Sequence, residues 1–426
     1  MPVIGLGSLV APSSLAQSLS LPTEQAAPAQ AVVNTSGVVT HLTYTDTPYY
    51  TDWPTVFSEL QSLGVRHIRD GLTDLPPGSP IFAEHQQLIG AGITTDYVVP
   101  YDPSITPQTI EQFAAQVQDM EALEAPNECD ILGDCGGGGT TGITNVLNFL
   151  PTLQAAAQDL QIPLLGPSFV LPSSYSAAGN ISSLINLNSM HVYFGGRNPG
   201  SSGWGDFDAE GNSYGSFAYW LDQSETDAPG IVPAITETGY ISFPTTSTPY
   251  TVPESVEALY VPRTLLLAFK YGYQETFFYQ LLDDPSSPQG YGLLRSDMSE
   301  KPAFVALKNL LSLLSDPGGT SFTPGALAYS ISGADSNLDH LLLQKSDGTF
   351  WLALWLEESS WDPATDTPIS VAPENIGIVL DGSHQAVADY QFDTSGNVTR
   401  FNQPMNGNLT SLTVTDRISI VEIDPM

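Results

Sequence analysis

The chain has 426 residues, which is enough for one to three domains with sizeable cores. Hydrophobic residues make up 41% of the sequence and aromatic residues 10%, which excludes a disordered chain. The sequence has 46 acidic and only 11 basic residues, giving a net charge of -35 that excludes nucleic acid and anionic lipid as main partners. Beyond the N-terminal region no run of about 18 apolar residues occurs, which argues against a membrane span.

The charge pattern also bears on the working environment. Charged residues are only 13% of the chain, so the surface consists largely of Ser, Thr, Gly, Asn and Gln. At low pH most carboxyl groups would be neutral, and the few basic groups would leave little positive charge to repel itself. This composition suggests an acidic environment, but an ordinary acidic secreted protein remains an equally good interpretation.

Residues 1–30 are apolar at first and then small and polar, with Ala-rich candidate cleavage points. This pattern is typical of a processed or truncated signal peptide, although a basic first region is missing, and it predicts secretion. Cys129 and Cys135 are close enough in sequence to close one small loop. A disulfide between them would fit an exported protein and free thiols a cytosolic one, so both states stay open.

From about residue 38 onward, segments with strand character alternate with segments of helical apolar spacing. Gly64 and Gly92 supply helix stops, and Pro107 stands at a tolerated early helical position. The expected strands cover 38–44, 64–71, 93–100, 122–128, 163–169, 188–196, 231–240 and 275–284. The expected helices cover 52–64, 80–92, 106–120, 145–160, 252–272 and 301–316.

Eight strands alternating with helices over about 280 residues predict a (β/α)8 TIM barrel across residues 31–318. A doubly wound α/β sheet would fit the alternation too. No Gly-rich phosphate loop follows the first expected strand, however, and no P-loop is present. The barrel is therefore the favoured fold.

The sequence pattern changes after the turn at 316–319, where the alternation of strands and helices ends. Short strands separated by turns follow, and Ser346-Asp347-Gly348 is typical of a hairpin. We expect residues 319–426 to form a smaller antiparallel β-sandwich, joined by an additional strand from residues 30–37.

In a barrel of this kind the active site lies at the carboxyl ends of the strands. Glu128 stands at the end of the fourth expected strand in Ala-Pro-Asn-Glu, and Glu237 near the end of the seventh in Ile-Thr-Glu-Thr-Gly. Two opposed carboxyl groups suit cleavage of a glycosidic bond, because one must be protonated to assist the leaving oxygen and the other ionised to attack the anomeric carbon. A lone Glu at a strand end is usually a solvated loop residue, but two in these positions favour catalysis.

These motifs resemble those of clan A glycoside hydrolases, which carry catalytic glutamates on strands four and seven, and the resemblance covers roughly residues 38–316. It implies that Glu128 is the acid/base, that Glu237 is the nucleophile and that the mechanism is retaining. Asn127 would then bond the sugar 2-hydroxyl. His191-x-Tyr193 resembles the strand-six motif whose Tyr contacts the nucleophile, and Arg69 the strand-two Arg that keeps the nucleophile ionised. These four residues form one part of the expected substrate site.

The first expected strand contributes His41 and Tyr44, which we expect to contact substrate hydroxyls. Many clan A enzymes place a Trp at the end of strand eight as a sugar platform, but the segment FYQLLDD has none. Either Trp204 or Tyr240 takes that place, or the subsite is built differently.

The sequence offers no convincing metal site, since its six histidines are scattered without an HExxH motif or a CxxC pair. Asp130 and Asp134 are candidate calcium ligands, but too few further oxygens accompany them. No GxSxG elbow is present, which disfavours a Ser-His-Asp hydrolase. We therefore expect neither a metal nor another cofactor.

The sequence thus predicts a secreted retaining β-glycoside hydrolase whose partner is a β-linked carbohydrate. A transglycosylase is an open alternative, because a sugar could replace water as the acceptor. The alternative from another class is a non-catalytic carbohydrate-binding or cell-envelope protein on a barrel scaffold, which would need neither Glu128 nor Glu237. The identity of the sugar, exo or endo action and the oligomeric state stay undetermined.

Overall fold

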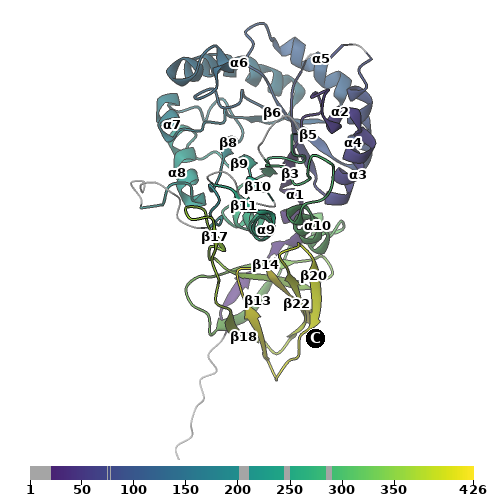
Figure 1. The fold of residues 1–426 in the computed structure, drawn as a ribbon, viewed down its shortest axis with the longest axis vertical. Helices are drawn as coiled ribbons and strands as arrows, with labels where there is room; N and C mark the ends of the chain where they lie inside the picture. Colours follow the sequence, from purple (N-terminus) through teal and green to yellow (C-terminus); the bar gives the residue numbers. More distant parts are fainter. Residues whose placement is uncertain (1–20, 74, 77, 201–210, 244–249, 285–289) are drawn as a thin grey trace, which may run out of the picture.

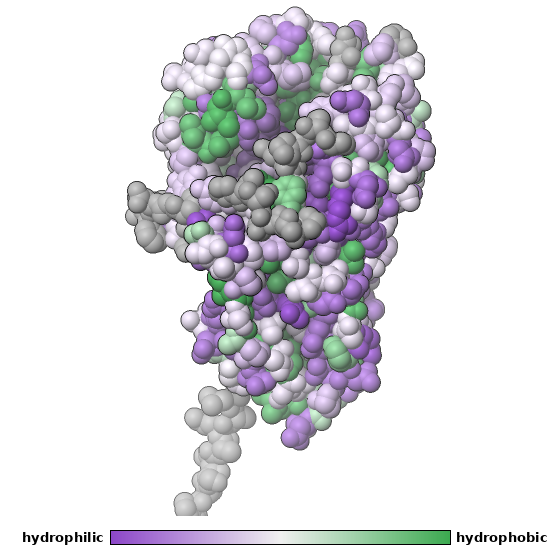
Figure 2. Space-filling model, in the orientation of Figure 1, coloured by the Kyte–Doolittle hydropathy of each residue, from purple (hydrophilic) through white to green (hydrophobic). Residues whose placement is uncertain are grey.

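The computed structural model describes residues 21–73, 75–76, 78–200, 211–243, 250–284 and 290–426. A ring of helices encloses a central set of strands, and a second, all-β region lies beside it (Figure 1). On the face drawn in Figure 2, the described surface is mostly hydrophilic to intermediate, with apolar residues in scattered patches. Among the described residues, no helix is both long enough and apolar enough to cross a bilayer.

The central strands form an eight-stranded parallel sheet with the order β7-β6-β5-β4-β3-β12-β9-β8. Isolated parallel bridges, Leu165 to Leu187 and Phe169 to Met190, join its two ends and nearly close it. The structure therefore confirms the predicted barrel. In chain order its strands are β3 (Ser36–Val39), β4 (His67–Gly71), β5 (Thr94–Val98), β6 (Met120–Glu124), β7 (Leu164–Leu165), β8 (Asn188–His191), β9 (Pro233–Thr238) and β12 (Thr276–Phe278).

Helices cover the outside of the barrel because each buries an apolar face against the strands or a neighbouring helix. In α10, for example, Leu307, Leu310 and Leu314 are fully buried. Gly64 ends α3 in the left-handed conformation, with φ 82°, which glycine adopts without strain. The main helices are α3 (Trp53–Leu63), α4 (Ile81–Ala91), α5 (Pro107–Val117), α6 (Gly139–Leu160), α7 (Pro172–Ala178), α8 (Phe217–Asp227), α9 (Glu254–Lys270) and α10 (Pro302–Leu314).

The second region is a sandwich of two largely antiparallel sheets, as predicted, with the orders β1-β13-β18-β21 and β2-β14-β15-β22-β19-β20. Here β1 is Thr23–Gln25 and β2 is Ala27–Pro28, and β2 pairs parallel with β14. Its core is apolar and includes Leu327, Leu352, Leu354 and Ile378. Alternation of buried and exposed residues along β21 is typical of a strand with one face in such a core. The sandwich strands from the C-terminal part are β13 (Ala326–Ser332), β14 (Leu338–Gln344), β15 (Phe350–Leu356), β18 (Glu374–Leu380), β19 (His384–Phe392), β20 (Val398–Asn402), β21 (Leu409–Val414) and β22 (Ser419–Pro425).

The N-terminal segment differs from the expectation. The strands that join the sandwich are β1 (Thr23–Gln25), paired with β13, and β2 (Ala27–Pro28), paired with β14, whereas 30–37 does not form the joining strand. Instead, α1 (Ala29–Asn34) buries Val32 and Val33, and β3 begins the barrel at Ser36. Local patterns do not reveal these strands, because Thr23–Gln25 and Ala27–Pro28 pair with strands that lie about 300 residues away in sequence. Residues 1–20 lie outside the described part, so their removal as a signal peptide stays a prediction.

One carboxylate of the sandwich links it to the barrel. Glu357, which follows β15, accepts hydrogen bonds from Asn198 Nδ2 at 2.5 Å, the Gly200 backbone N–H at 3.1 Å and Arg263 Nη2 at 2.5 Å. The segment 198–200 follows β8, and Arg263 is a fully buried residue of α9. The sandwich thus fixes part of the chain that continues from a strand of the barrel.

Candidate active site

Glu237 lies on β9 at the carboxyl end of the barrel and is only 8% exposed. Arg69 of β4 donates to Glu237 Oε1 from Nη1 at 2.7 Å. The hydroxyl of Tyr193, two residues beyond β8, donates to Glu237 Oε2 at 2.9 Å. Both oxygens of this carboxyl group therefore accept a hydrogen bond, one of them from a cation, and such charge-assisted bonds are short and strong.

Arg69 is held by a second carboxylate that the sequence prediction missed. Glu124, the last residue of β6, is fully buried and accepts from Arg69 Nε at 2.6 Å and from Nη2 at 3.0 Å. The same Nη2 donates to Asn127 Oδ1 at 2.8 Å. Burial alone would lower the pKa of Arg69, but the carboxylates of Glu124 and Glu237 outweigh it and raise that pKa, so the cation is permanent.

Glu128 lies four residues beyond the last residue of β6 and keeps 18% of its side chain exposed. Its Oε1 is 2.8 Å from His191 Nδ1, at the end of β8. Its backbone is left-handed, with φ 47°, which is uncommon for a residue other than glycine and concentrates at functional sites. The backbone N–H of Glu128 donates to the Ser168 carbonyl oxygen at 3.1 Å, so the turn that presents the carboxyl group is fixed.

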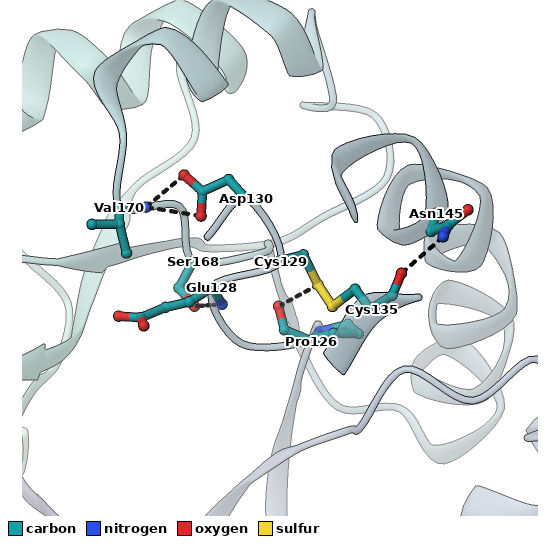
Figure 3. Close-up of a disulfide and its surroundings, with 8 residues drawn as sticks. All are labelled: Pro126, Glu128, Cys129, Asp130, Cys135, Asn145, Ser168 and Val170. Atoms are coloured by element: carbon teal, nitrogen blue, oxygen red, sulfur yellow. Dashed lines mark hydrogen bonds between the residues drawn. A yellow bond between two sulfur atoms is a disulfide. The ribbon is translucent and has the colours of Figure 1, made fainter. Parts of the chain in front are cut away.

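A disulfide stands directly behind Glu128. Cys129 and Cys135 are bonded, with their Cα atoms 5.4 Å apart, and the Glu128 side chain points away from them (Figure 3). Asn145 of α6 donates to the Cys135 carbonyl oxygen at 2.8 Å. A Cβ atom on Gly142 would stand 1.8 Å from the Cys129 carbonyl oxygen, so only glycine allows α6 to pack this closely. The loop after β6 is therefore held from two sides.

The two glutamates and His191 converge on one point. A carboxylate oxygen of Glu128, one of Glu237 and a ring nitrogen of His191 all lie within 4.8 Å of one another. Burial opposes the charged form of His191, but Glu237 and Glu128 outweigh it and raise the pKa of its imidazole. Among the described residues this is the group whose spacing would suit a metal ion, yet each member already bonds a neighbour of the same site.

A cleft of about 530 Å³ opens beside this pair. Tyr44 is 47% exposed there and stacks on His41, with ring centroids 4.5 Å apart and an angle of 10° between the planes. The structure thus brings both residues of the first barrel loop to the cleft, as predicted from the strand order. The cleft is also lined by Arg69, Asp70, Tyr101, Asn127, Glu128, Leu132, Asp134, Glu237 and Tyr279.

The expected aromatic platform differs from the prediction. Tyr240 is buried, 2% exposed, its hydroxyl donates to the Arg197 carbonyl oxygen, and its ring packs on Phe194, so it cannot offer a face to a sugar. Trp204 lies outside the described residues. Tyr279, the residue after β12, lines the cleft instead. The signal in the sequence is the aromatic run of ETFFYQ, which ends on this Tyr rather than on a Trp.

The carboxylate oxygens of Asp130 already accept hydrogen bonds from the protein. Its carboxylate accepts from the backbone N–H groups of Val170 at 3.0 Å and Leu171 at 2.8 Å, and from the Ser174 hydroxyl at 2.8 Å. It thereby satisfies donors at the start of α7. Asp134 is exposed and lines the cleft, so the two residues do not form the calcium site considered from the sequence.

Glu124 could have been recognised from the sequence. It is a carboxylate in the apolar stretch ALEAP, and a charge inside a buried strand requires a partner. The identity of that partner, Arg69, depends on which strands adjoin β6 in three dimensions. The pattern therefore marks the residue as paired but does not reveal with what.

Comparison with known proteins places the fold. Neither a protein-family model nor a curated protein matches the sequence. Solved structures do match over nearly the whole chain. A GH30 xylanase C catalytic domain from Talaromyces cellulolyticus is 12% identical with a TM-score of 0.57, covering 95% of this chain and 98% of that one. A glucosidase from Croceicoccus marinus is 12% identical with a TM-score of 0.58, covering 96% and 100%.

A third similar structure is the GH51 arabinofuranosidase from Xanthomonas axonopodis pv. citri, which is 12% identical with a TM-score of 0.56 and covers 95% of this chain and 98% of that one. At 12% identity, the structural similarity establishes the fold alone. The reaction must be inferred from the residues of the site. The chain therefore has the fold of the clan A glycoside hydrolases, a (β/α)8 barrel joined to a β-sandwich.

Proposed function

We propose that this protein is a secreted retaining β-glycoside hydrolase, with Glu237 as the nucleophile and Glu128 as the acid/base. The observation that carries the proposal is the approach of the two carboxyl groups, which have oxygens within 4.8 Å of each other at the mouth of the barrel. Retaining enzymes hold their two carboxyl groups about 5–5.5 Å apart, whereas inverting enzymes need about 6.5–9.5 Å to admit a water molecule.

The partners of each group fit the two different roles. Glu237 receives bonds from Arg69 and Tyr193, so a cation and a hydroxyl group hold both its oxygens in place. Glu128 contacts His191; burial opposes the charged form of this imidazole, but Glu237 and Glu128 raise its pKa. Glycoside cleavage requires one carboxyl group that attacks and one that exchanges a proton, and the two groups here have different neighbours.

In the first step, Glu128 donates a proton to the glycosidic oxygen while Glu237 attacks the anomeric carbon. The bond from that carbon to the leaving oxygen breaks, and a glycosyl ester forms on Glu237. Asn127, whose carbonyl oxygen accepts from Arg69, would donate its amide N–H to the sugar 2-hydroxyl. In the second step, Glu128 takes a proton from water, which attacks the same carbon and releases Glu237.

Secretion rests on different support. The Cys129–Cys135 disulfide is typical of oxidising compartments, where such bonds persist. It lies against the loop that presents Glu128, so its reduction should disturb the acid/base. Activity should therefore fall after treatment with a thiol reductant, and the Cys129→Ser, Cys135→Ser double variant should show the same loss without treatment.

The test is product release from β-linked glucans, xylans, mannans, galactans and uronic-acid glycans at pH 3 to 6. Wild type is compared with Glu237→Gln and Glu128→Gln, which keep the size of each side chain. Active wild type and variants at least about 10³-fold slower would support the assignment. Glu300→Gln, at a half-buried ion-pair residue before α10, is the matched control and should keep full activity.

The anomeric configuration of the first product, followed by proton NMR, tests the mechanism. A β-linked substrate should first yield the β-anomer, and an initial α-anomer would contradict retention. Larger products that carry the donor sugar would identify transglycosylation. Silence on every glycan, combined with measurable glycan affinity, would favour the non-catalytic binding protein.

A further inference from the structure

Building on the proposed glycosidase function, we propose that the cleft selects an uncharged sugar next to the catalytic pair and rejects one that carries a carboxylate. The inference concerns the sugar whose anomeric carbon Glu237 would attack, since the cleft lies against that residue. It narrows the substrate class from any β-linked glycan to neutral ones.

The distribution of cations is the first observation. All 11 Lys and Arg residues of the sequence lie in the part of the chain that the structure describes, and among them Arg69 alone lines the cleft. Arg69 is buried, and its guanidinium nitrogens already donate to Glu124, Glu237 and Asn127. A bidentate Arg is the usual protein partner of a ligand carboxylate. Here the N–H groups of Arg69 donate to side chains of the protein itself.

The acidic side chains are the second observation. Asp134 is exposed on the cleft wall contributed by the loop after β6, and Asp70, Glu128 and Glu237 line the same cleft. Asp284 lies near enough to act electrostatically on His41 and Tyr44. Like charges brought together in a partly desolvated cleft repel each other, so a ligand carboxylate would be disfavoured.

The remaining lining residues suit an uncharged sugar. His41 faces Asp70, Glu237, Asp284 and Arg69, yet burial dominates and lowers the pKa of its imidazole, so it meets the ligand as a neutral ring. Tyr44 stacks on that ring and is itself 47% exposed. Neutral aromatic faces pack on the C–H surfaces of sugars, and hydroxyl groups need only hydrogen bonds.

The test uses three aryl β-glycosides that differ only in the C5 substituent: the xyloside with hydrogen, the glucoside with a hydroxymethyl group and the glucuronide with a carboxylate. The β-galactoside and β-galacturonide form a second pair. At pH 6.5, where the uronic acids are ionised, kcat/KM for the better neutral glycoside should exceed that for its uronide by about 100-fold or more. Lowering the pH through the uronic acid's own pKa should shrink this ratio.

Variants at Asp134 test whether the repulsion of a ligand carboxylate arises in the cleft. Asp134→Asn should raise relative uronide activity several-fold at pH 6.5, whereas Asp134→Glu, which keeps the charge, should leave the ratio unchanged. Asp347→Asn removes one charge from an exposed turn of the sandwich and controls for net charge. If Asp347→Asn acted as strongly as Asp134→Asn, the selection would not reside in the cleft and the inference would fail.

The outcomes separate this inference from the function on which it rests. A uronide cleaved as fast as the neutral glycosides at pH 6.5 would overturn the inference and leave the glycosidase assignment intact. Cleavage of no glycoside in either series, together with silence on the polysaccharides, would overturn the function itself.

Discussion

The barrel and the sandwich differ in how they bury charged side chains. At the carboxyl end of the barrel, Arg69, Glu124 and Glu237 are buried together and joined by hydrogen bonds. The sandwich core consists mainly of residues such as Leu352, Leu354 and Ile378, and its buried carboxylate, Asp389, accepts hydrogen bonds from neutral groups, Ser419 and Gln391. Burying charge costs free energy even when it is paired. The comparison indicates that the barrel accepts this cost at its carboxyl end in order to hold a reactive arrangement.

Asp96 extends this contrast. It lies on β5 opposite Arg69, is fully buried, and neither of its oxygens has a hydrogen-bond partner among the described residues. Burial first, and then Glu124 and Glu275, raise its pKa well above the ordinary value, which favours its neutral form. Arg69 is therefore left to neutralise Glu124 and Glu237.

The largest expected effect follows from removing the barrel's central cation. Arg69→Met should lower kcat/KM by about 10²–10³-fold, because Glu237 loses its cationic donor and an adjacent cation favours an ionised carboxyl group. The acid limb of the pH–rate profile should move upward, which a merely unfolded fraction would not cause. Arg66→Met, three residues earlier, is the control; an unchanged pH profile in Arg69→Met would contradict the role of this cation.

A core substitution in the sandwich should affect stability and leave catalysis alone. Leu354→Ala empties a fully buried position and should lower the free energy of unfolding by about 2–5 kcal/mol. The kcat measured well below the unfolding temperature should stay within about twofold of wild type. Denaturant unfolding and initial rates on the same sample check this. A large loss of kcat in folded Leu354→Ala would show that the sandwich core takes part in catalysis.

Glu357 lies on the boundary between the two regions, so its effect should be mixed. Glu357→Gln weakens the bonds from Asn198, Gly200 and Arg263 and leaves Arg263 buried with less compensation. We expect a loss of about 1–3 kcal/mol in stability and a several-fold rise in KM, because the segment it holds continues from Tyr193. Glu358→Gln, its exposed neighbour, should change neither. Loss of stability with an unchanged KM would confine Glu357 to a structural role.

The smallest expected effect concerns pH. Burial raises the pKa of Glu257 to about 8 and those of Glu275 and Asp227 to about 7. Because these folded-state values exceed the unfolded ones, their contribution is complete below about pH 4 and is lost as the pH rises through 7 and 8. The melting temperature should fall by about 1 °C or more between pH 5 and pH 8.5. A rise over that interval would contradict both this linkage and the suggested acidic environment.

The sequence predicted the elements that local patterns encode. The strand and helix alternation identified the barrel, and the rule that sites lie at the carboxyl ends of its strands brought Glu128, Glu237, His191 and Arg69 together. The errors concern long-range contacts. Residues 23–28 look unstructured alone because their partners lie in β13 and β14, and the burial of Tyr240 depends on packing against Phe194.

The most direct test of the central claim is to trap the glycosyl-enzyme. An activated 2-deoxy-2-fluoro β-glycoside of the best substrate destabilises charge at the anomeric carbon, so an intermediate should accumulate and add one fluoroglycosyl mass to the protein. Peptide mapping should place that mass on Glu237, and Glu237→Gln should take up none. A label on Glu128 would contradict the assignment of Glu237 as the nucleophile. So would the absence of any label from the fluoroglycoside in a preparation that rapidly hydrolyses the natural glycoside.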